Sequence, residues 1–231
     1  GPVGQSLATL LGRRGISVVV FDRQEGLFPL PRACHLDHET MRILQAMGIA
    51  DEIDEAIVPA TEYHLLRADG RLLARLPRDW ETPSGWESSY HFFQPDVEVI
   101  FDEAAKATPG VTVRQGAAVA AVADEGDRAR LVLDDGEVVH ARFVVGADGA
   151  NSLVREAAGI SREDLGFEAT WVVVDVEVDA GHDVPDIPDT AQVLDPARPR
   201  HMAWLGGRHV RWEFMVLDSD PADAANPERI W

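Results

Sequence analysis

Cysteine is nearly absent from this chain, since Cys34 is the only one among 231 residues. A single thiol cannot form an intramolecular disulfide, so a disulfide-stabilised fold is excluded, and such scarcity is typical of the reducing cytoplasm. The sequence also lacks a run of about eighteen apolar residues and a recognisable signal peptide, so we expect no membrane span and a cytoplasmic location.

Basic residues are also scarce. The 21 lysines and arginines stand against 40 aspartates and glutamates, which gives a formal net charge of −19. An acidic chain repels the phosphates of nucleic acids and anionic lipids, so we expect neither as a partner. The hydrophobic fraction of 45% is ordinary for a globular protein, and the length suits one large domain or two small ones.

The first residues predict the second half of a βαβ unit. Residues 5–14 have a helix-like apolar pattern, residues 16–21 are a continuous run rich in β-branched side chains, and Asp22 follows. A run without alternation predicts a strand buried on both faces, as in a parallel sheet. Gly1 and Gly4 then match the end of a dinucleotide-binding glycine turn, and Asp22 lies about 20 residues further on, where an acid meets ribose hydroxyls. The alternative for Asp22 is a solvated residue at a strand end.

A second glycine turn occupies residues 144–155, after a run from Val138 to Val145 that predicts a strand. Two glycines flank Asp148 and allow the backbone to approach a ligand closely. Asn151 and Ser152 are suitable N-cap residues, and a helix N-terminus offers N–H groups to an anion. These features suit a nucleotide, but a strand–turn–helix corner with a capping aspartate explains the same residues equally well.

Two further polar residues are candidates. Arg32, between Pro31 and Ala33, has the bidentate geometry that clamps a pyrophosphate, although a solvated loop arginine is the alternative. Gln94 comes just before a helix expected to run through Ala107, and its alternative role is to satisfy backbone groups at the start of that helix.

His35, His38 and Glu39 are residue types that ligate metals. No third histidine is near enough to complete a site, so we expect no metal. Asp37 or Glu39 is better explained as an acid in the first turn of a helix over residues 40–47.

Asp-Gly turns at residues 69–70 and 135–136 join alternating runs and predict two hairpins. After about residue 164 the chain becomes β-rich, with alternating runs at residues 171–178, 202–205 and 210–216. A two-domain NAD dehydrogenase is disfavoured, because its second half would repeat βα units.

In this order, the features resemble the flavoprotein aromatic hydroxylases, the single-component FAD monooxygenases typified by p-hydroxybenzoate hydroxylase. The Gly-Ala-Asp-Gly segment at residues 146–149, followed by Ser-x-Val-Arg at 152–155, is specific to this superfamily. The similarity to the 3-(3-hydroxyphenyl)propionate hydroxylases within it is carried by residues 31–33, 35–39, 43–48 and 171–175.

The resemblance implies an α/β fold, α+β overall, in which a Rossmann-like parallel sheet binds FAD and carries an inserted β-rich substrate domain. It implies an FAD-binding domain at residues 1–60 and 90–164, a hairpin and loop at 61–89, and the start of a truncated substrate domain at 165–231.

The resemblance also assigns roles to single residues. Gly1 and Gly4 would lie against the FAD pyrophosphate, and Asp22, in place of the more frequent glutamate, would bind the adenosine ribose. Arg32 would contact FAD and help at the nicotinamide-nucleotide site, and Gln94 would bind the ribityl-phosphate chain. The motif that the family uses for both FAD and NAD(P)H supplies Asp148, Gly149 and Arg155.

The implied reaction uses NAD(P)H to reduce FAD, which then forms a C4a-hydroperoxide with O2 and hydroxylates a phenolic acid such as 3-(3-hydroxyphenyl)propionate. Its partners would be the small phenol and O2. Whether the protein forms a homo-oligomer is left open by the resemblance. His35 and His201 are candidates for a general base by residue type alone, so the catalytic residues stay unassigned. The alternatives are a flavin hydroxylase of polyketide or polycyclic phenols and a non-catalytic nucleotide-binding fragment.

The family pattern is incomplete in this sequence. The first strand and first glycine of the glycine turn are missing, as is the later Gly-Asp motif at the ribityl chain, so we expect a fragment of the enzyme.

We therefore expect the isolated chain to bind FAD poorly, because a parallel sheet without a central strand has unpaired edges and an incomplete core. Absorbance at about 450 nm of the purified chain measures bound flavin. A stoichiometrically yellow chain would contradict this expectation.

Overall fold

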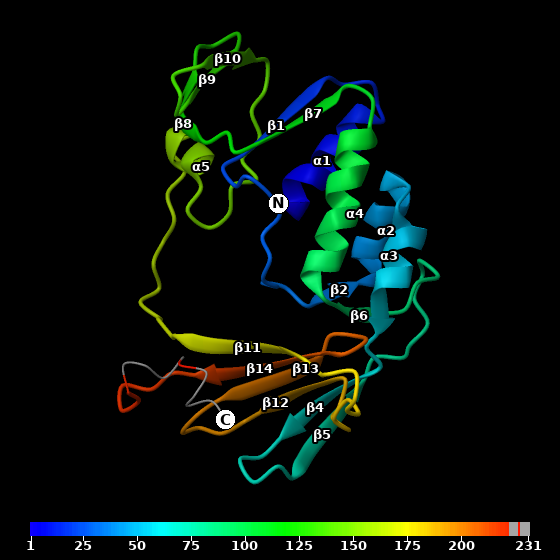
Figure 1. Ribbon diagram of the computed structural model, residues 1–231. Helices are drawn as coiled ribbons and strands as arrows, with labels where there is room; N and C mark the ends of the chain where they lie inside the picture. The colour runs from blue at the N-terminus through cyan, green and yellow to red at the C-terminus, as the bar shows by residue number, and fades with distance from the viewer. Residues whose placement is uncertain (222–225, 227–231) are drawn as a thin grey trace. The chain divides into compact units, whose positions relative to one another are not determined.

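The computed structural model describes residues 1–221 and 226, which form two compact units (Figure 1). Unit 1 contains residues 1–30, 44–52 and 95–165, and unit 2 contains residues 31–43, 53–94 and those from 166 onward. The last part of the domain expected at 165–231, namely residues 222–225 and 227–231, lies outside the described residues. The units interleave along the chain, and the assignment of domains to FAD and substrate stays a prediction.

Unit 1 is built on a parallel strand pair and an antiparallel sheet (Figure 1). The pair joins β1 (Val18–Asp22) to β7 (Val111–Gln115), with Val18 opposite Val111. The sheet has the order β10-β9-β8, from β8 (Val119–Asp124), β9 (Ala129–Leu133) and β10 (Val138–Ala141). The helices wholly or largely within the unit are α1 (Pro2–Gly12), α4 (Gln94–Ala107) and α5 (Leu153–Ala157).

Helix α1 ends close to the predicted place and leads directly into β1. Gly15 adopts a φ of +76°, which glycine reaches without strain, and its N–H donates to the carbonyl of Gly12. The N–H of Ile16 donates back to Leu11, which closes the helix end. The predicted order of helix, glycine and parallel strand is confirmed.

The expectation that β1 is buried on both faces is wrong. Val19 is 47% exposed, because β1 has a single hydrogen-bonded neighbour, β7, among the described residues. An unbroken β-branched run indicates a strand, but burial also needs elements that cover both of its faces.

The strand expected from Val138 to Val145 is also too long. Strand β10 ends at Ala141, opposite Ala129 at the start of β9, and Phe143 beyond it is 80% exposed. The apolar pattern continues past Ala141, but a strand needs a hydrogen-bonded partner and β9 offers none there.

Unit 2 contains a six-stranded sheet in the order β11-β14-β13-β12-β4-β5 (Figure 1). The Asp-Gly hairpin is confirmed, since β4 (Glu62–Leu66) and β5 (Leu72–Pro77) pair in antiparallel fashion and Gly70 has a φ of +80°. The remaining strands are β11 (Trp171–Glu177), β12 (Thr190–Val193), β13 (Arg200–Trp204) and β14 (His209–Met215).

A second sheet of unit 2 is small, and its central strand is buried. Its order is β2-β6-β3, from β2 (His35–Asp37), β3 (Ile57–Pro59) and β6 (Ser89–Phe92). The chain between β2 and β3 forms helices α2 (His38–Met47) and α3 (Ala50–Ala56), which both units share. Every residue of the central strand β6 is buried.

None of the helices formed by residues 1–221 and 226 is long and apolar enough to span a membrane.

The buried strand β6 carries a histidine whose proton affinity is strongly perturbed. His91 is 3% exposed, and burial together with the positive charges of His35 and Arg78 lowers its pKa from 6.5 to about 4. Between these pH values the unfolded chain binds more protons at this residue than the folded chain does. The free energy of unfolding therefore falls as the pH drops through this window.

We expect His91 to remove about 2 kcal/mol of stability between pH 7 and pH 5, which urea unfolding at both pH values measures. His91→Gln should flatten this dependence, because the uncharged amide does not titrate. The matched control is His182→Gln, at an exposed loop histidine, which should keep the dependence of the parent chain. Equal pH dependence in the parent and His91→Gln would contradict the assignment.

Candidate cofactor site

The end of β1 lies beside the start of α1. The Gly1 ammonium donates to Oδ2 of Asp22 at 2.9 Å, and the N–H of Gln24 donates to Oδ1 at 3.0 Å. Burial alone raises the pKa of Asp22, but these hydrogen bonds and the positive charge outweigh it and hold the pKa below its ordinary value. Asp22 is therefore an ionised acceptor at the helix N-terminus.

Glycines mark the start of α1. Among the described residues, no side chain donates or accepts a capping hydrogen bond at this helix start. A Cβ at Gly4 would lie 3.6 Å from the Cβ of Ala147. The start of α1 and the second glycine turn are thus neighbours, although more than 100 residues separate them in the sequence.

Asp148 is held by the helix that follows it. The Ser152 hydroxyl donates to its Oδ1, and the N–H of Val154 donates to its Oδ2 at 3.2 Å. Burial raises the pKa of Asp148, but these hydrogen bonds hold it below its ordinary value. Ser152 is the N-cap of α5, because its Oγ accepts from the N–H of Arg155 at 3.0 Å. The capping geometry that we kept as an alternative is present, and it neither supports nor opposes a ligand role.

Two arginines converge on the same turn. Nη1 of Arg155 donates to the carbonyl of Ala150 at 2.7 Å, and Nη1 of Arg162 donates to it at 3.1 Å. Gly149 in this turn has a φ of +82°, which explains the glycine there. Arg162 was missed by sequence reasoning, because it lies beyond the motif in an irregular segment.

Arg32 and Gln94 meet in unit 2 through the backbone. Oε1 of Gln94 accepts from the N–H groups of Arg32 and Ala33, both at 2.6 Å. Gln94 thus contacts a loop about 60 residues earlier, and its proposed role toward FAD stays a prediction. The other six predicted site residues belong to unit 1.

Sequence reasoning missed Arg211 of unit 2, which contacts the Arg32 loop, and its ion-pair partner Asp175. Arg211 in β14 pairs with Asp175 in β11 and donates from Nη2 to the carbonyl of Pro31 at 2.7 Å. The sequence did contain a signal for this pair, because each of two strand-like runs has a charged residue inside it. A charge in a buried strand needs a partner.

The two histidines named by residue type have separate surroundings. His35 contacts the Ser89 hydroxyl through Nε2 at 2.7 Å and lies edge-on to His91. Nε2 of His201 is 3.0 Å from the hydroxyl of Thr190. Neither contact assigns a catalytic base. Within residues 1–221 and 226, no three histidine, cysteine or acidic side chains gather in a way that could hold a metal ion.

An open crevice of about 720 Å³ lies in unit 1 between the end of β7 and the turn after β9. None of the eight predicted site residues lines it. The candidate site is therefore defined by polar groups at element ends rather than by this crevice.

Comparison with known protein families identifies the family of the chain. Residues 1–227 match the family described as FAD binding domain. The chain therefore belongs to this family of FAD-binding domains. The resemblance to the FAD-dependent aromatic hydroxylases and the mixed fold with a parallel strand pair are both confirmed.

The chain is similar to two curated proteins over its whole length. It is 37% identical to a protein of Rhodococcus jostii strain RHA1 named "Probable NADH-specific resorcinol 4-hydroxylase". It is 34% identical to a Burkholderia vietnamiensis protein named 3-(3-hydroxy-phenyl)propionate/3-hydroxycinnamic acid hydroxylase 2. The chain spans 44% and 42% of these relatives.

Solved structures share the fold. The p-nitrophenol 4-monooxygenase PnpA of Pseudomonas putida DLL-E4 superposes with a TM-score of 0.87 at 23% identity, over 100% of this chain and 60% of that chain. The aklavinone-11 hydroxylase in complex with FAD and aklavinone gives a TM-score of 0.80 at 25% identity, over 100% of this chain and 47% of that chain.

Proposed function

We propose that this chain is the FAD-binding part of a monooxygenase that hydroxylates a phenolic aromatic acid with NAD(P)H and O2. The observation that carries the proposal is the cluster of Asp22, the uncapped start of α1 and the second glycine turn in unit 1. The cluster combines an ionised carboxylate, which accepts hydrogen bonds, with backbone that a ligand can approach. A nucleotide requires both.

The residues of unit 1 fit the adenosine and pyrophosphate part of FAD. We propose that Gly1 and Gly4 lie against the pyrophosphate at the helix N-terminus, where an anion is favoured. Asp22 accepts from the N–H of Gln24 at 3.0 Å, and we propose that its carboxylate also accepts from a ribose hydroxyl. We propose that the turn of Asp148, Gly149 and Arg155 contacts FAD and the nicotinamide nucleotide.

In unit 2, we propose that Arg32 contacts FAD and helps to bind NAD(P)H, and that Gln94 serves the ribityl-phosphate chain. Gln94 binds the backbone N–H groups of Arg32 and Ala33, and it thereby positions the backbone from which the Arg32 side chain extends. An arginine can bind a phosphate with two parallel hydrogen bonds. Bound FAD would supply the transfer of electrons to O2 and of one oxygen atom to the ring, while the protein orients the reactants and excludes water.

We propose a small phenol with one ring as the substrate. The names of the two relatives, which are 37% and 34% identical to this chain, mention resorcinol and 3-(3-hydroxyphenyl)propionate. A polycyclic phenol is the second candidate, because the structure with aklavinone has the same fold at 25% identity. The higher identity favours the small phenols.

The test of the reaction uses the full-length gene product that carries this sequence. We expect NADH or NADPH oxidation to be faster with resorcinol or 3-(3-hydroxyphenyl)propionate, and to yield the product with one additional ring hydroxyl. Oxidation without product, or stimulation by aklavinone alone, would contradict the proposed substrate class. A full-length product that holds no flavin would contradict the proposed function itself.

In the same protein, Asp22→Ala should weaken FAD binding about 10- to 100-fold, because a charge-assisted hydrogen bond to ribose is lost. Asp22→Glu should retain most of the affinity, since it keeps the carboxylate. The matched control is Asp124→Ala, because Asp124 accepts from the N–H two residues later, at 2.8 Å, as Asp22 does at 3.0 Å. Fluorescence titration of FAD measures the affinities, and equal losses in Asp22→Ala and Asp124→Ala would refute the role of Asp22.

A further inference from the structure

Strand β14 presents a buried cation on one face of the six-stranded sheet. Arg211 is 2% exposed, and its Nε and Nη2 donate to the two carboxylate oxygens of Asp175 at 2.8 and 3.0 Å. The two residues are directly opposite each other in the β11–β14 ladder. The carboxylate therefore fixes the plane of the guanidinium in a bidentate pair.

The same guanidinium reaches out of the sheet. Its Nη2 also donates to the backbone carbonyl of Pro31 at 2.7 Å, a contact between residues 180 positions apart. Pro31 directly precedes Arg32, to which the proposed function gives a contact with FAD. Asp175 thus orients the guanidinium of Arg211, and Arg211 binds the loop that carries Arg32.

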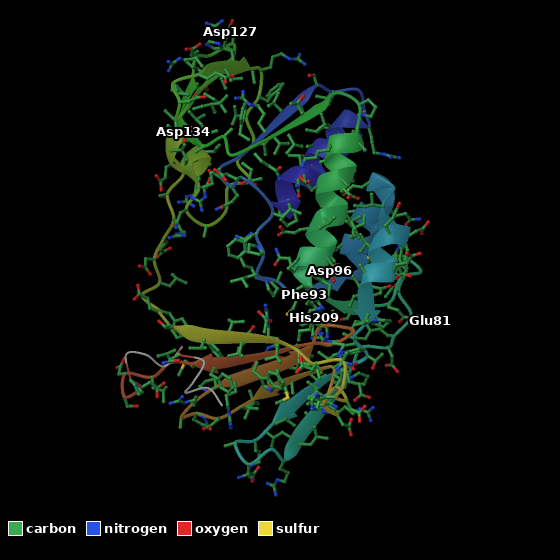
Figure 2. The ribbon with its side chains drawn as sticks, viewed as in Figure 1. Glu81, Phe93, Asp96, Asp127, Asp134 and His209 are labelled. Carbon is green, nitrogen blue, oxygen red and sulfur yellow. The ribbon has the colours of Figure 1, made fainter. Side chains whose placement is uncertain are left out.

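A second contact from β14 reaches Phe93, the residue before Gln94. His209 stacks on Phe93, with ring centroids 3.9 Å apart and an interplanar angle of 4° (Figure 2). His209 and Arg211 are two residues apart in a strand, so their side chains lie on the same face. Phe93 directly precedes Gln94, whose Oε1 accepts from the N–H groups of Arg32 and Ala33.

These contacts form a closed ring. It runs from His209 to Phe93 and Gln94, through the hydrogen bonds to the Arg32 loop, and from Pro31 back to Arg211. We propose that His209 and Arg211 of β14 are positioning residues, which fix the Pro31–Ala33 loop and thereby the place of Arg32 for binding FAD. The part that concerns FAD rests on the proposed function, whereas the fixing of the loop does not.

Stability alone is a weak reason for this charge pair, in which Arg211 is buried and Asp175 is not. Burial of a charge carries a desolvation cost that the attraction of its partner often only offsets, and an apolar residue of similar volume can be equally stable. An apolar residue, however, could not donate to the carbonyl of Pro31. The arginine is therefore needed for the geometry of the loop.

Cys34 gives a direct readout of the loop, because it follows Ala33 and is the only cysteine of the chain. Burial raises the pKa of the Cys34 thiol, and the charge and hydrogen bond of Arg211 lower it. Removal of the arginine would therefore slow thiol labelling by its electrostatic effect, whereas release of the loop would accelerate labelling. The two effects have opposite signs.

The first test measures the labelling of Cys34 with a thiol-specific disulfide reagent in the 231-residue chain. We expect labelling about tenfold faster in Arg211→Lys and Arg211→Met, and severalfold faster in His209→Leu, because local opening becomes easier. The matched control is Arg208→Lys, at an arginine that binds the backbone carbonyls of residues 178, 179 and 182. It should label at the rate of the parent chain.

The labelling rate of each variant is compared with the rate that global unfolding alone would produce. Urea unfolding of the same variant under the same conditions gives that second rate. Labelling of Arg211→Lys that is unchanged, slower, or fully explained by global unfolding would overturn the proposal. Equal acceleration in Arg208→Lys would overturn it as well.

The second test is a double-mutant cycle on FAD affinity, measured by fluorescence titration of the full-length gene product that carries this sequence. Arg211→Lys should weaken binding about fivefold when Arg32 is present and have no effect in the Arg32→Ala background, because it acts through Arg32. Equal effects in both backgrounds would overturn the positioning role toward FAD. A full-length product that binds no FAD at any concentration would contradict the proposed function and the FAD part of this inference, and the labelling rates alone would then decide whether β14 fixes the loop.

Discussion

The parallel pairing of β1 with β7 is the constraint on which the arrangement of unit 1 depends. The pairing fixes where β1 ends, and Asp22 at that end accepts a hydrogen bond from Gly1 at the start of α1. Since the helix precedes the strand by a single glycine turn, a shift of the register would separate the acid from the helix N-terminus. The position of Asp22, on which the chemistry proposed for this unit depends, therefore follows from a backbone ladder.

Unit 2 uses side chains for the same purpose. Its sheet is antiparallel except where β12 pairs with β4, and one face carries the pair of Asp175 and Arg211. Buried charges in a sheet interior require partners, and here the arginine also binds a backbone carbonyl outside the sheet. A β-rich unit thereby orders an irregular loop that has no ladder of its own.

Much of the local structure could be predicted because its causes are local. The Asp-Gly hairpin, the helix closed by Gly15 and the capping of α5 by Ser152 depend on residues within a few positions of one another. The length of β10 and the exposure of Val19 could not be predicted in this way, since both depend on which strand lies next to them. The partner of Gln94 lies about 60 residues away, and no pattern in the sequence indicated it.

The sequence by itself indicated the family, through the resemblance of its ordered motifs, and it determined the glycine turns and helix caps, because these depend on local backbone conformation and short spacing. Only the tertiary structure decided that Gly4 lies beside Ala147, that Gln94 holds Arg32, and that Arg211 binds Pro31. These contacts join positions from about 60 to 180 residues apart. A hydrogen bond forms wherever the packed elements bring donor and acceptor within about 3 Å, whatever their separation along the chain.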